Sequence, residues 1–558
     1  MSQRAAAQSR EALLVAGLVL APLLPFLGKA FSIDTPVFVA VARQIVAAPL
    51  DPFGFEMFWD ETSLAAAVFN RNPPLLSYWL APWLALFGEH EWLLHAATLV
   101  FPLVAALAFL GIARRLCGAG VAPAVLLVTS PAFVVLATTL LLDVPVLACM
   151  LLAVYALLRG SDAGAARWQW GAGAAVAAAG LMKYVGFSAA PLVGAGALLL
   201  CERRGVAFAR VMLPPLLVWS GWALWTQQLY GAVHFFGSTD VVAQRSYAMP
   251  LFGNQATSAF IWYGGALVFP VVLWARTLLR AGRGLEVALL ALGVGAAAVV
   301  FLVTDGEPAR RHAIDLGHTV LAIVCCAGGA FLWLAVLRPR EALATPEDAF
   351  LSLWLGGLLV FSLFVNWHIN AADALLAAPP ALLLWFRRPE LRPSAAWVRG
   401  CVVGMLLLSI GLAVADTIQA NFYRSVARRI VEEIGDAPGA RWFVGNWGFQ
   451  HYLVERGFRP VLPIALGESR LAEGDWLAAP RNVAQQEIGV HQQLYEVVET
   501  GSFERAGDWP LRTTNPDAGA GFYSHRLGYT PFAWSRRAFE TVQLGRVVAV
   551  KAPVPGVP

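Results

Sequence analysis

The chain has 558 residues, of which 58% are hydrophobic and 14% are charged, and its mean hydropathy is +0.63. This composition excludes an ordinary soluble domain and indicates a polytopic helical membrane protein. The net charge of +4 is small and spread over many short loops, which excludes a nucleic-acid partner. The six cysteines lie in apolar segments or at their ends, in neither a disulfide framework nor a zinc-binding pattern.

The first apolar run follows Arg4 and Arg10 and ends near Leu27. A signal peptide has the same outline, but this run lacks a convincing small-residue cleavage site. We therefore expect a retained membrane anchor.

Hydropathy and basic residues together predict the membrane topology. A bilayer core needs about 20 apolar residues per helix, and Lys and Arg gather on the cytoplasmic side. Basic clusters such as Arg114 and Arg115 fall on the side of Arg4 and Arg10, which predicts a cytoplasmic N-terminus and an extracytoplasmic C-terminus. The expected spans number about thirteen, approximately at residues 11–28, 92–114, 119–141, 144–159, 168–183, 185–201, 208–229, 256–276, 285–303, 315–337, 349–367, 371–386 and 398–416.

The first outer loop, at about residues 29–91, is predicted to contain two surface helices. Residues 35–48 have the pattern of an amphipathic helix with Arg43 on its polar side. Asn72 and two prolines break the chain before a second apolar helix at residues 75–87, which we expect to lie on the membrane surface rather than to span it.

The composition changes after Asp416, and residues 421–558 are long enough for one small domain. A helix at residues 424–434, a strand at 441–444 and a helix at 448–455 predict an α/β or α+β fold. The expected organisation is a transmembrane domain at residues 1–420 and an extracytoplasmic domain at 421–558.

Three ionisable residues are predicted at the outer ends of separate helices: Asp34, Asp143 and Lys183. A charge at mid-bilayer costs about 2.5–3.5 kcal/mol, so each one needs a physical reason. Each of the three residues also has an explanation that involves no function. Asp34 could be a solvated charge, Asp143 could cap a helix, and Lys183 could extend to the membrane interface. Their shared membrane side favours a common site, where the two acids could also share a divalent ion.

Other outer polar residues are weaker candidates for substrate binding. His234 and Arg245 lie in a loop that could close over a substrate. Arg310 and Arg311 lie in a densely charged outer loop and could bind phosphate. His368 and Asp373 are also predicted to face outward.

The order of these motifs resembles that of GT-C class membrane glycosyltransferases of the family 39 type, which are related to protein O-mannosyltransferases and the lipid A aminoarabinose transferase. The matching features are Asp34 after the first span, Asn72 with its two prolines, Asp143 between the third and fourth spans, and Lys183 followed by Tyr184. This chain has Asn72 where relatives often have Lys or His, and Arg71 beside it is a candidate substitute.

The resemblance implies an inverting transfer of a sugar from a polyprenyl-phosphate donor on the extracytoplasmic face of a bacterial inner membrane. It implies that Asp34 is the catalytic base, Asp143 the second acidic residue and Lys183 a cation near the donor phosphate, with Tyr184 beside it. The acceptor could be a glycan, a lipid or a protein. Two other functions remain open: a transporter or flippase of lipid-linked sugars, and a non-catalytic membrane scaffold.

Overall fold

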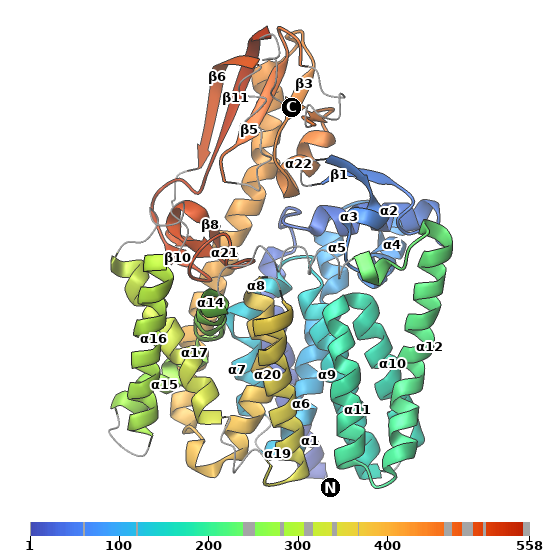
Figure 1. The fold of residues 1–558 in the computed structure, drawn as a ribbon, viewed down its shortest axis with the longest axis vertical. Helices are drawn as coiled ribbons and strands as arrows, with labels where there is room; N and C mark the ends of the chain where they lie inside the picture. The colour runs from blue at the N-terminus through green and yellow to red at the C-terminus, as the bar shows by residue number, and fades with distance from the viewer. Residues whose placement is uncertain are drawn as a thin grey trace.

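The computed structural model describes residues 2–59, 62–118, 121–163, 165–237, 252–279, 284–305, 316–336, 343–366, 368–462, 471–482, 495–505 and 509–550. These residues form a helical bundle with a smaller strand-containing region above it (Figure 1). The N-terminus lies at the opposite end of the bundle from this upper region.

The bundle is built from apolar helices whose small residues allow close packing. Gly264 and Gly329, for example, lie at close backbone contacts with Cys325 and Phe260, where a larger side chain would collide. The bundle helices are α1 (Ser2–Leu23), α5 (Glu91–Thr98), α6 (Val100–Cys117), α7 (Val121–Val128), α8 (Pro131–Ala137), α9 (Asp143–Ala163), α10 (Ala166–Met182), α11 (Ala189–Leu200), α12 (Arg204–Tyr230), α14 (Phe252–Gly265), α15 (Phe269–Leu279), α16 (Leu285–Asp305), α17 (Leu316–Val336), α19 (Pro346–Val360), α20 (Ala371–Arg387) and α21 (Ala395–Ile434).

The polytopic helical prediction is confirmed, but the count of thirteen crossings is not. Within the described ranges, seven helices are long and apolar enough to cross a membrane, or eight if the bent pair α14 and α15 counts as one span. Helical residues occur at every predicted span, but several spans are short or interrupted. One is divided where Ser130 caps α8 at Pro131, and α14 and α15 meet at 84° beside Val268, which has a left-handed φ of 64°.

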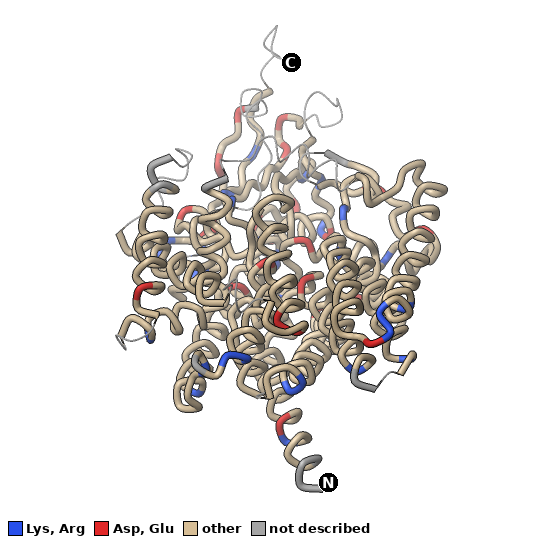
Figure 2. The backbone as a smooth tube through the Cα atoms, turned by 60° about the horizontal axis from the view of Figure 1, so that its bottom comes forward, with Lys and Arg blue, Asp and Glu red and all other residues tan. Residues whose placement is uncertain are grey.

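Basic residues gather at the end of the bundle that holds the N-terminus, which Figure 2 turns toward the viewer. Arg114 pairs with Glu11 of α1 at 2.6 Å, and Arg387 pairs with Asp348 at 2.7 Å. Arg387 also donates to the backbone oxygen of Leu116, so the ends of α6 and α20 lie together. The one-sided distribution follows the pattern that positive charge adopts on the cytoplasmic face of membranes.

The first outer loop forms a layer over the opposite end of the bundle (Figure 1). It contains α2 (Thr35–Ala47), the hairpin of β1 (Glu56–Trp59) and β2 (Thr62–Ala65), α3 (Ala66–Phe69) and α4 (Leu75–Phe87). Both predicted surface helices are present. Ser77 of α4 donates a 2.9 Å hydrogen bond to the backbone oxygen of Phe38, so the two helices pack together.

The C-terminal region combines a mixed sheet with helices, as the sequence predicts. The sheet has strand order β4-β3-β5-β11-β6, in which β3 is parallel to β4 and β5 while β5, β11 and β6 are antiparallel. Helix α21 continues as one 40-residue helix through the predicted boundary after residue 420 (Figure 1). The remaining elements are β3 (Arg441–Phe443), α22 (Trp447–Val454), β4 (Arg459–Pro460), β5 (Trp476–Pro480), β6 (Tyr495–Arg505), β7 (Leu511–Arg512), β8 (Thr514–Asn515), β9 (Ala520–Gly521), β10 (Ala533–Trp534) and β11 (Glu540–Val550).

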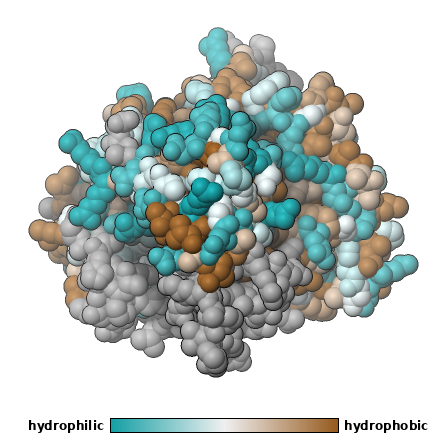
Figure 3. Space-filling model, turned by 90° about the horizontal axis from the view of Figure 1, so that it is seen from above, coloured by the Kyte–Doolittle hydropathy of each residue, from teal (hydrophilic) through white to brown (hydrophobic). Residues whose placement is uncertain are grey.

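On the upper face of the molecule, hydrophilic side chains gather toward the middle of the residues that Figure 3 colours, with apolar patches among and beside them. By contrast, α12 exposes Leu216, Leu217 and Leu224 along its length, which is the pattern of a helix that faces lipid.

Candidate functional site

The loop before α2 places Asp34 in an unusual backbone setting. Ile33 has a φ of 51°, in the left-handed region that a β-branched residue rarely adopts. Asp34 follows at the N-cap of α2, yet its side chain accepts no cap hydrogen bond. Strained backbone of this kind persists only where surrounding contacts enforce it, and it gathers at functional sites.

Contacts from the C-terminal region enforce this loop conformation. The backbone N–H of Phe31 donates to the hydroxyl of Tyr452 at 2.8 Å, and the N–H of Ala30 donates to Asn421 at 3.0 Å. A Cβ added to Gly448 at the start of α22 would lie 2.3 Å from the backbone oxygen of Phe31. The tail therefore packs directly against the segment that carries Asp34.

Lys183 and Asp143 form an ion pair between two helix ends. Helix α10 ends at Met182, and the extended backbone of Lys183 directs its ammonium to the first residue of α9, where Nζ lies 2.7 Å from Asp143 Oδ1. The Lys183 side chain is 30% exposed and that of Asp143 is 11% exposed. The boundary predicted between the spans at residues 168–183 and 185–201 thus matches the end of α10 at Met182.

Two further carboxylates act on the same ammonium. Burial lowers the pKa of Lys183, but the charge and hydrogen bond of Asp143, with the charges of Asp373 and Asp34, outweigh burial and raise it. Asp373 lies in the first turn of α20, where its carboxylate accepts from Asn366 and from the backbone of Asn370, at 2.9 Å each. The charges of three acids from three elements therefore act on one lysine.

An aromatic cluster lies beside this group. The hydroxyl of Tyr184 is 2.6 Å from His234 Nδ1, and Phe53 stacks on the imidazole with ring centroids 4.7 Å apart. Burial lowers the pKa of His234 to about 4, and the charge of Arg71 contributes. His234 is therefore neutral at neutral pH, and Arg71 is near enough to act on it electrostatically.

A buried polar network that was not predicted from the sequence is centred on Lys29, five residues before Asp34. Lys29 is fully buried, forms an ion pair with Asp416 of α21 and donates to Thr139 at 2.6 Å. Tyr523 and Thr513 of the tail donate to Asp416 at 2.7 and 2.8 Å. Two features of the sequence could have indicated this network: a lysine just after the first helix and an aspartate within the last apolar helix.

The remaining residues predicted to bind substrate have other contacts or lie outside the described part of the chain. Arg43 bonds to Glu89 and approaches Glu455, in a group considered below. The backbone of Asn72 donates to Asn70 at 3.1 Å, and His368 Nε2 lies 3.1 Å from the amide of Asn370. Arg245, Arg310 and Arg311 lie outside the residues that the structure describes. The divalent ion predicted between Asp34 and Asp143 stays a prediction. In the structure, Lys183 provides the positive charge beside Asp143.

This arrangement combines the parts that a group transfer to or from a phosphate requires. Carboxylates can take a proton from an acceptor, and a partly exposed ammonium can bind a phosphate oxygen. The aromatic cluster offers flat apolar faces beside them.

A comparison with protein families matches residues 71–225 to the family described as dolichyl-phosphate-mannose-protein mannosyltransferase. This range includes Arg71, Asn72, Asp143, Lys183 and Tyr184, and the match confirms the family resemblance predicted from the sequence. No curated protein matches the chain.

Solved structures with partial similarity include the following. ArnT from Cupriavidus metallidurans in the apo state is 15% identical, with a TM-score of 0.42 and coverage of 98% of this chain and 100% of that chain. The same protein bound to undecaprenyl phosphate is 16% identical, with a TM-score of 0.40 and coverage of 99% and 100%. The Archaeoglobus fulgidus oligosaccharyltransferase in the apo form is 12% identical, with a TM-score of 0.46 and coverage of 88% and 73%.

Proposed function

We propose that this chain is an integral membrane glycosyltransferase that transfers a sugar from a polyprenyl-phosphate donor to an acceptor on the extracytoplasmic face. The observation that carries the proposal is the ion pair of Lys183 with Asp143 at the outer ends of two helices, which the charges of Asp34 and Asp373 also reach. The family description supports the donor class, because dolichyl phosphate is a polyprenyl phosphate. The acceptor is a glycan, a lipid or a protein.

Asp34 is the general base of the proposed reaction. A hydroxyl or amine of the acceptor attacks the anomeric carbon opposite the phosphate, the bond from this carbon to the phosphate oxygen breaks, and Asp34 takes the proton from the acceptor. The anomeric configuration inverts, and polyprenyl phosphate is the second product. A positioned base contributes about 10²–10⁴-fold to such reactions.

Lys183 stabilises the negative charge that develops on the leaving phosphate. A phosphate needs a nearby cation more than a proton donor, and positive charge held in place before the reaction requires little reorganisation. Asp143 holds the ammonium at 2.7 Å, and the 30% exposure of the lysine side chain leaves it accessible to a donor. Asp143 thus positions Lys183 in the proposed mechanism.

The test is transfer of radiolabelled sugar from a panel of polyprenyl-phosphate donors in membranes that contain the wild type or Asp34→Asn. We expect transfer to fall by at least about 10²-fold in the variant, at equal protein level. The matched control is Glu56→Gln, which removes an exposed carboxylate from the same outer loop and should leave transfer unchanged. Full turnover by Asp34→Asn would exclude Asp34 as the base.

The proposed location is the inner membrane of a bacterium, with the N-terminus in the cytoplasm and the C-terminal region outside. Basic residues at the N-terminal end of the bundle support this orientation. Single cysteines placed at exposed Arg10 and Arg428 should differ in labelling by an impermeant reagent in intact cells, with only the second labelled. Labelling of the first alone would reverse the proposed orientation.

A further inference from the structure

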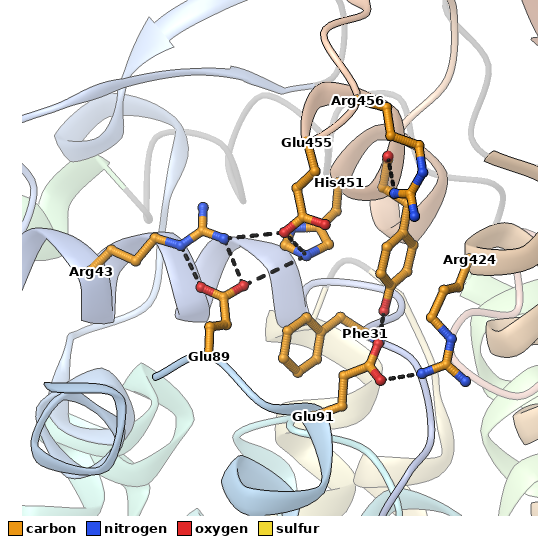
Figure 4. Close-up of polar contacts among 9 residues, drawn as sticks. Phe31, Arg43, Glu89, Glu91, Arg424, His451, Glu455 and Arg456 are labelled. Atoms are coloured by element: carbon orange, nitrogen blue, oxygen red, sulfur yellow. Dashed lines mark hydrogen bonds and ion pairs between the residues drawn. The ribbon is translucent and has the colours of Figure 1, made fainter. Parts of the chain in front are cut away.

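Glu89, His451 and Glu455 converge at the contact between the outer loop and α22 (Figure 4). Glu89 lies between α4 and α5, His451 lies on α22, and Glu455 directly follows α22. One ligand atom from each lies within 4.8 Å of the other two. Across the residues that the structure describes, this is the one group of three or more such side chains close enough to hold a metal ion.

The spacing of the three side chains suits a metal ion. His451 Nε2 lies 3.3 Å from Glu455 Oε1 and 3.7 Å from Glu89 Oε1. Ligands about 2.0–2.1 Å from a tetrahedral ion are about 3.3–3.4 Å from each other. A hydrogen bond from a ring nitrogen would be shorter, at about 2.9 Å. Of the three separations, the first already equals a ligand separation and the second needs a contraction of a few tenths of an ångström, while the third, between the two carboxylates, lies within 4.8 Å.

Packing fixes the imidazole before any ion binds. The His451 side chain is 7% exposed, and its ring makes edge contacts with Phe31 and Tyr452 at centroid distances of 5.4 and 4.9 Å. The two carboxylates come from opposite sides of the contact, as Figure 4 shows. A ligand set held in this way binds with little loss of side-chain freedom.

A divalent ion could take the place of the guanidinium of Arg43 in this cluster. Glu89 and Glu455 carry two negative charges; the charge of Arg456 acts on Glu455, and Arg43 supplies a second positive charge by direct contact. The guanidinium contacts both carboxylates, at 2.6 Å to Glu89 Oε1 and 3.5 Å to Glu455 Oε1. Its side chain is 47% exposed and can turn toward solvent. A divalent ion in its place would neutralise both carboxylates.

We propose that Glu89, His451 and Glu455 bind one divalent transition-metal ion of the zinc class, which joins α22 to the outer loop. One imidazole and two carboxylates are ligands that zinc accepts in proteins. Because α22 also packs against the loop of Asp34 through Gly448, the ion would stabilise the tail over that loop. This role is separate from the transfer reaction and does not depend on the proposed activity.

The test is calorimetric titration of zinc chloride into the full-length chain, purified in detergent and stripped with a chelator. We expect one zinc ion per chain and a rise in melting temperature. His451→Ala and Glu455→Gln should weaken binding by more than about 100-fold, because even an outer partner of a metal ligand contributes about 10–100-fold. His90→Ala, which removes an exposed imidazole next to Glu89, should bind zinc like the wild type.

Arg43→Ala separates a metal site from a simple ion-pair cluster. If zinc competes with the guanidinium, this variant should bind zinc about 2–5-fold more tightly, the size of an exposed ion pair. A cluster held only by Arg43 would instead bind no zinc in any form and lose stability in the variant. Absence of zinc binding, or equal binding by the wild type and Glu455→Gln, would overturn the proposal. Glu455 is 41% exposed, so its substitution tests the site without disturbing the fold.

Discussion

At Lys183, a single ammonium group interacts with three carboxylates at the outer ends of the helices. Removing the ammonium as Lys183→Ala should weaken binding of a polyprenyl-phosphate sugar by about 10–100-fold, the value of a charged hydrogen bond. Equilibrium binding of a labelled donor to the purified protein measures this change. Arg428→Ala is the matched control, since it removes an exposed cation from α21.

Folding and binding effects of this variant can be separated. Lys183→Ala leaves the buried carboxylate of Asp143 without its ion-pair partner, which is itself destabilising. The double variant Lys183→Ala/Asp143→Asn removes both charges and should recover thermal stability without recovering donor binding. Unchanged donor affinity in the single variant would remove Lys183 from the site.

The buried pair of Lys29 and Asp416 gives a second prediction at this scale. Lys29→Met should lower the free energy of unfolding by about 3–5 kcal/mol, because Asp416 would stay buried with its charge uncompensated. Thermal unfolding in detergent measures the loss. Lys29→Met/Asp416→Asn should recover most of it, and an equally large loss in the double variant would mean that the pair is not the cause.

A residue could be predicted as part of the candidate site where both its chemical type and its predicted side of the membrane pointed to that site. Asp34, Asp143 and Lys183 each interrupt an apolar sequence at the same predicted side, so a common site could be predicted without contacts, and Asp143 and Lys183 form an ion pair in the structure. Lys29 and Asp416 are 387 positions apart, and each has an ordinary explanation at a helix end. Their pairing depends on how the first and last apolar helices pack, which a single sequence does not contain.

At the scale of elements, α22 and the loop before α2 meet without space between them. Gly448→Ala should destabilise the chain by about 1–3 kcal/mol and reduce transfer, because a methyl group would collide with the backbone oxygen of Phe31. Thermal unfolding and the transfer assay measure the two effects. Gly404→Ala in α21 has open space and should be neutral or slightly stabilising. A neutral Gly448→Ala would show that this contact does not control the loop.

The sequence predicts where a helix forms more accurately than whether that helix is interrupted. The surface helices α2 and α4 follow from amphipathic periodicity and from the two prolines after Asn72, and both form as predicted. The break between α7 and α8 and the bend between α14 and α15 depend on local geometry at Ser130 and Val268. An apolar run gives no periodic signal for such an interruption, which explains why hydropathy predicted more full spans than the helices support.

At the scale of the whole molecule, the C-terminal region belongs to the candidate site as well as to the surface above it. Tyr452 binds the backbone of Phe31, and Tyr523 binds Asp416 beside Lys29. Burial raises the pKa of Tyr523, and the charges of Asp416 and Asp143 raise it further. The sequence predicted a small domain at residues 421–558, and its contacts with Phe31 and Asp416 join distant positions in the chain and could not be inferred from local patterns.

Because the C-terminal region packs against the loop of Asp34, deletion of this region and cleavage of the full-length chain should have different effects on transfer. A chain that ends at Ile434 should lose transfer although Asp34, Asp143 and Lys183 remain, because the contacts that fix the Asp34 loop are gone. A full-length chain with a protease site inserted in the exposed turn at residues 436–439 should keep transfer after cleavage, since the buried contacts persist. Co-purification of the two fragments and the transfer assay measure both outcomes. Full activity without the tail would mean that the helical bundle alone organises the site.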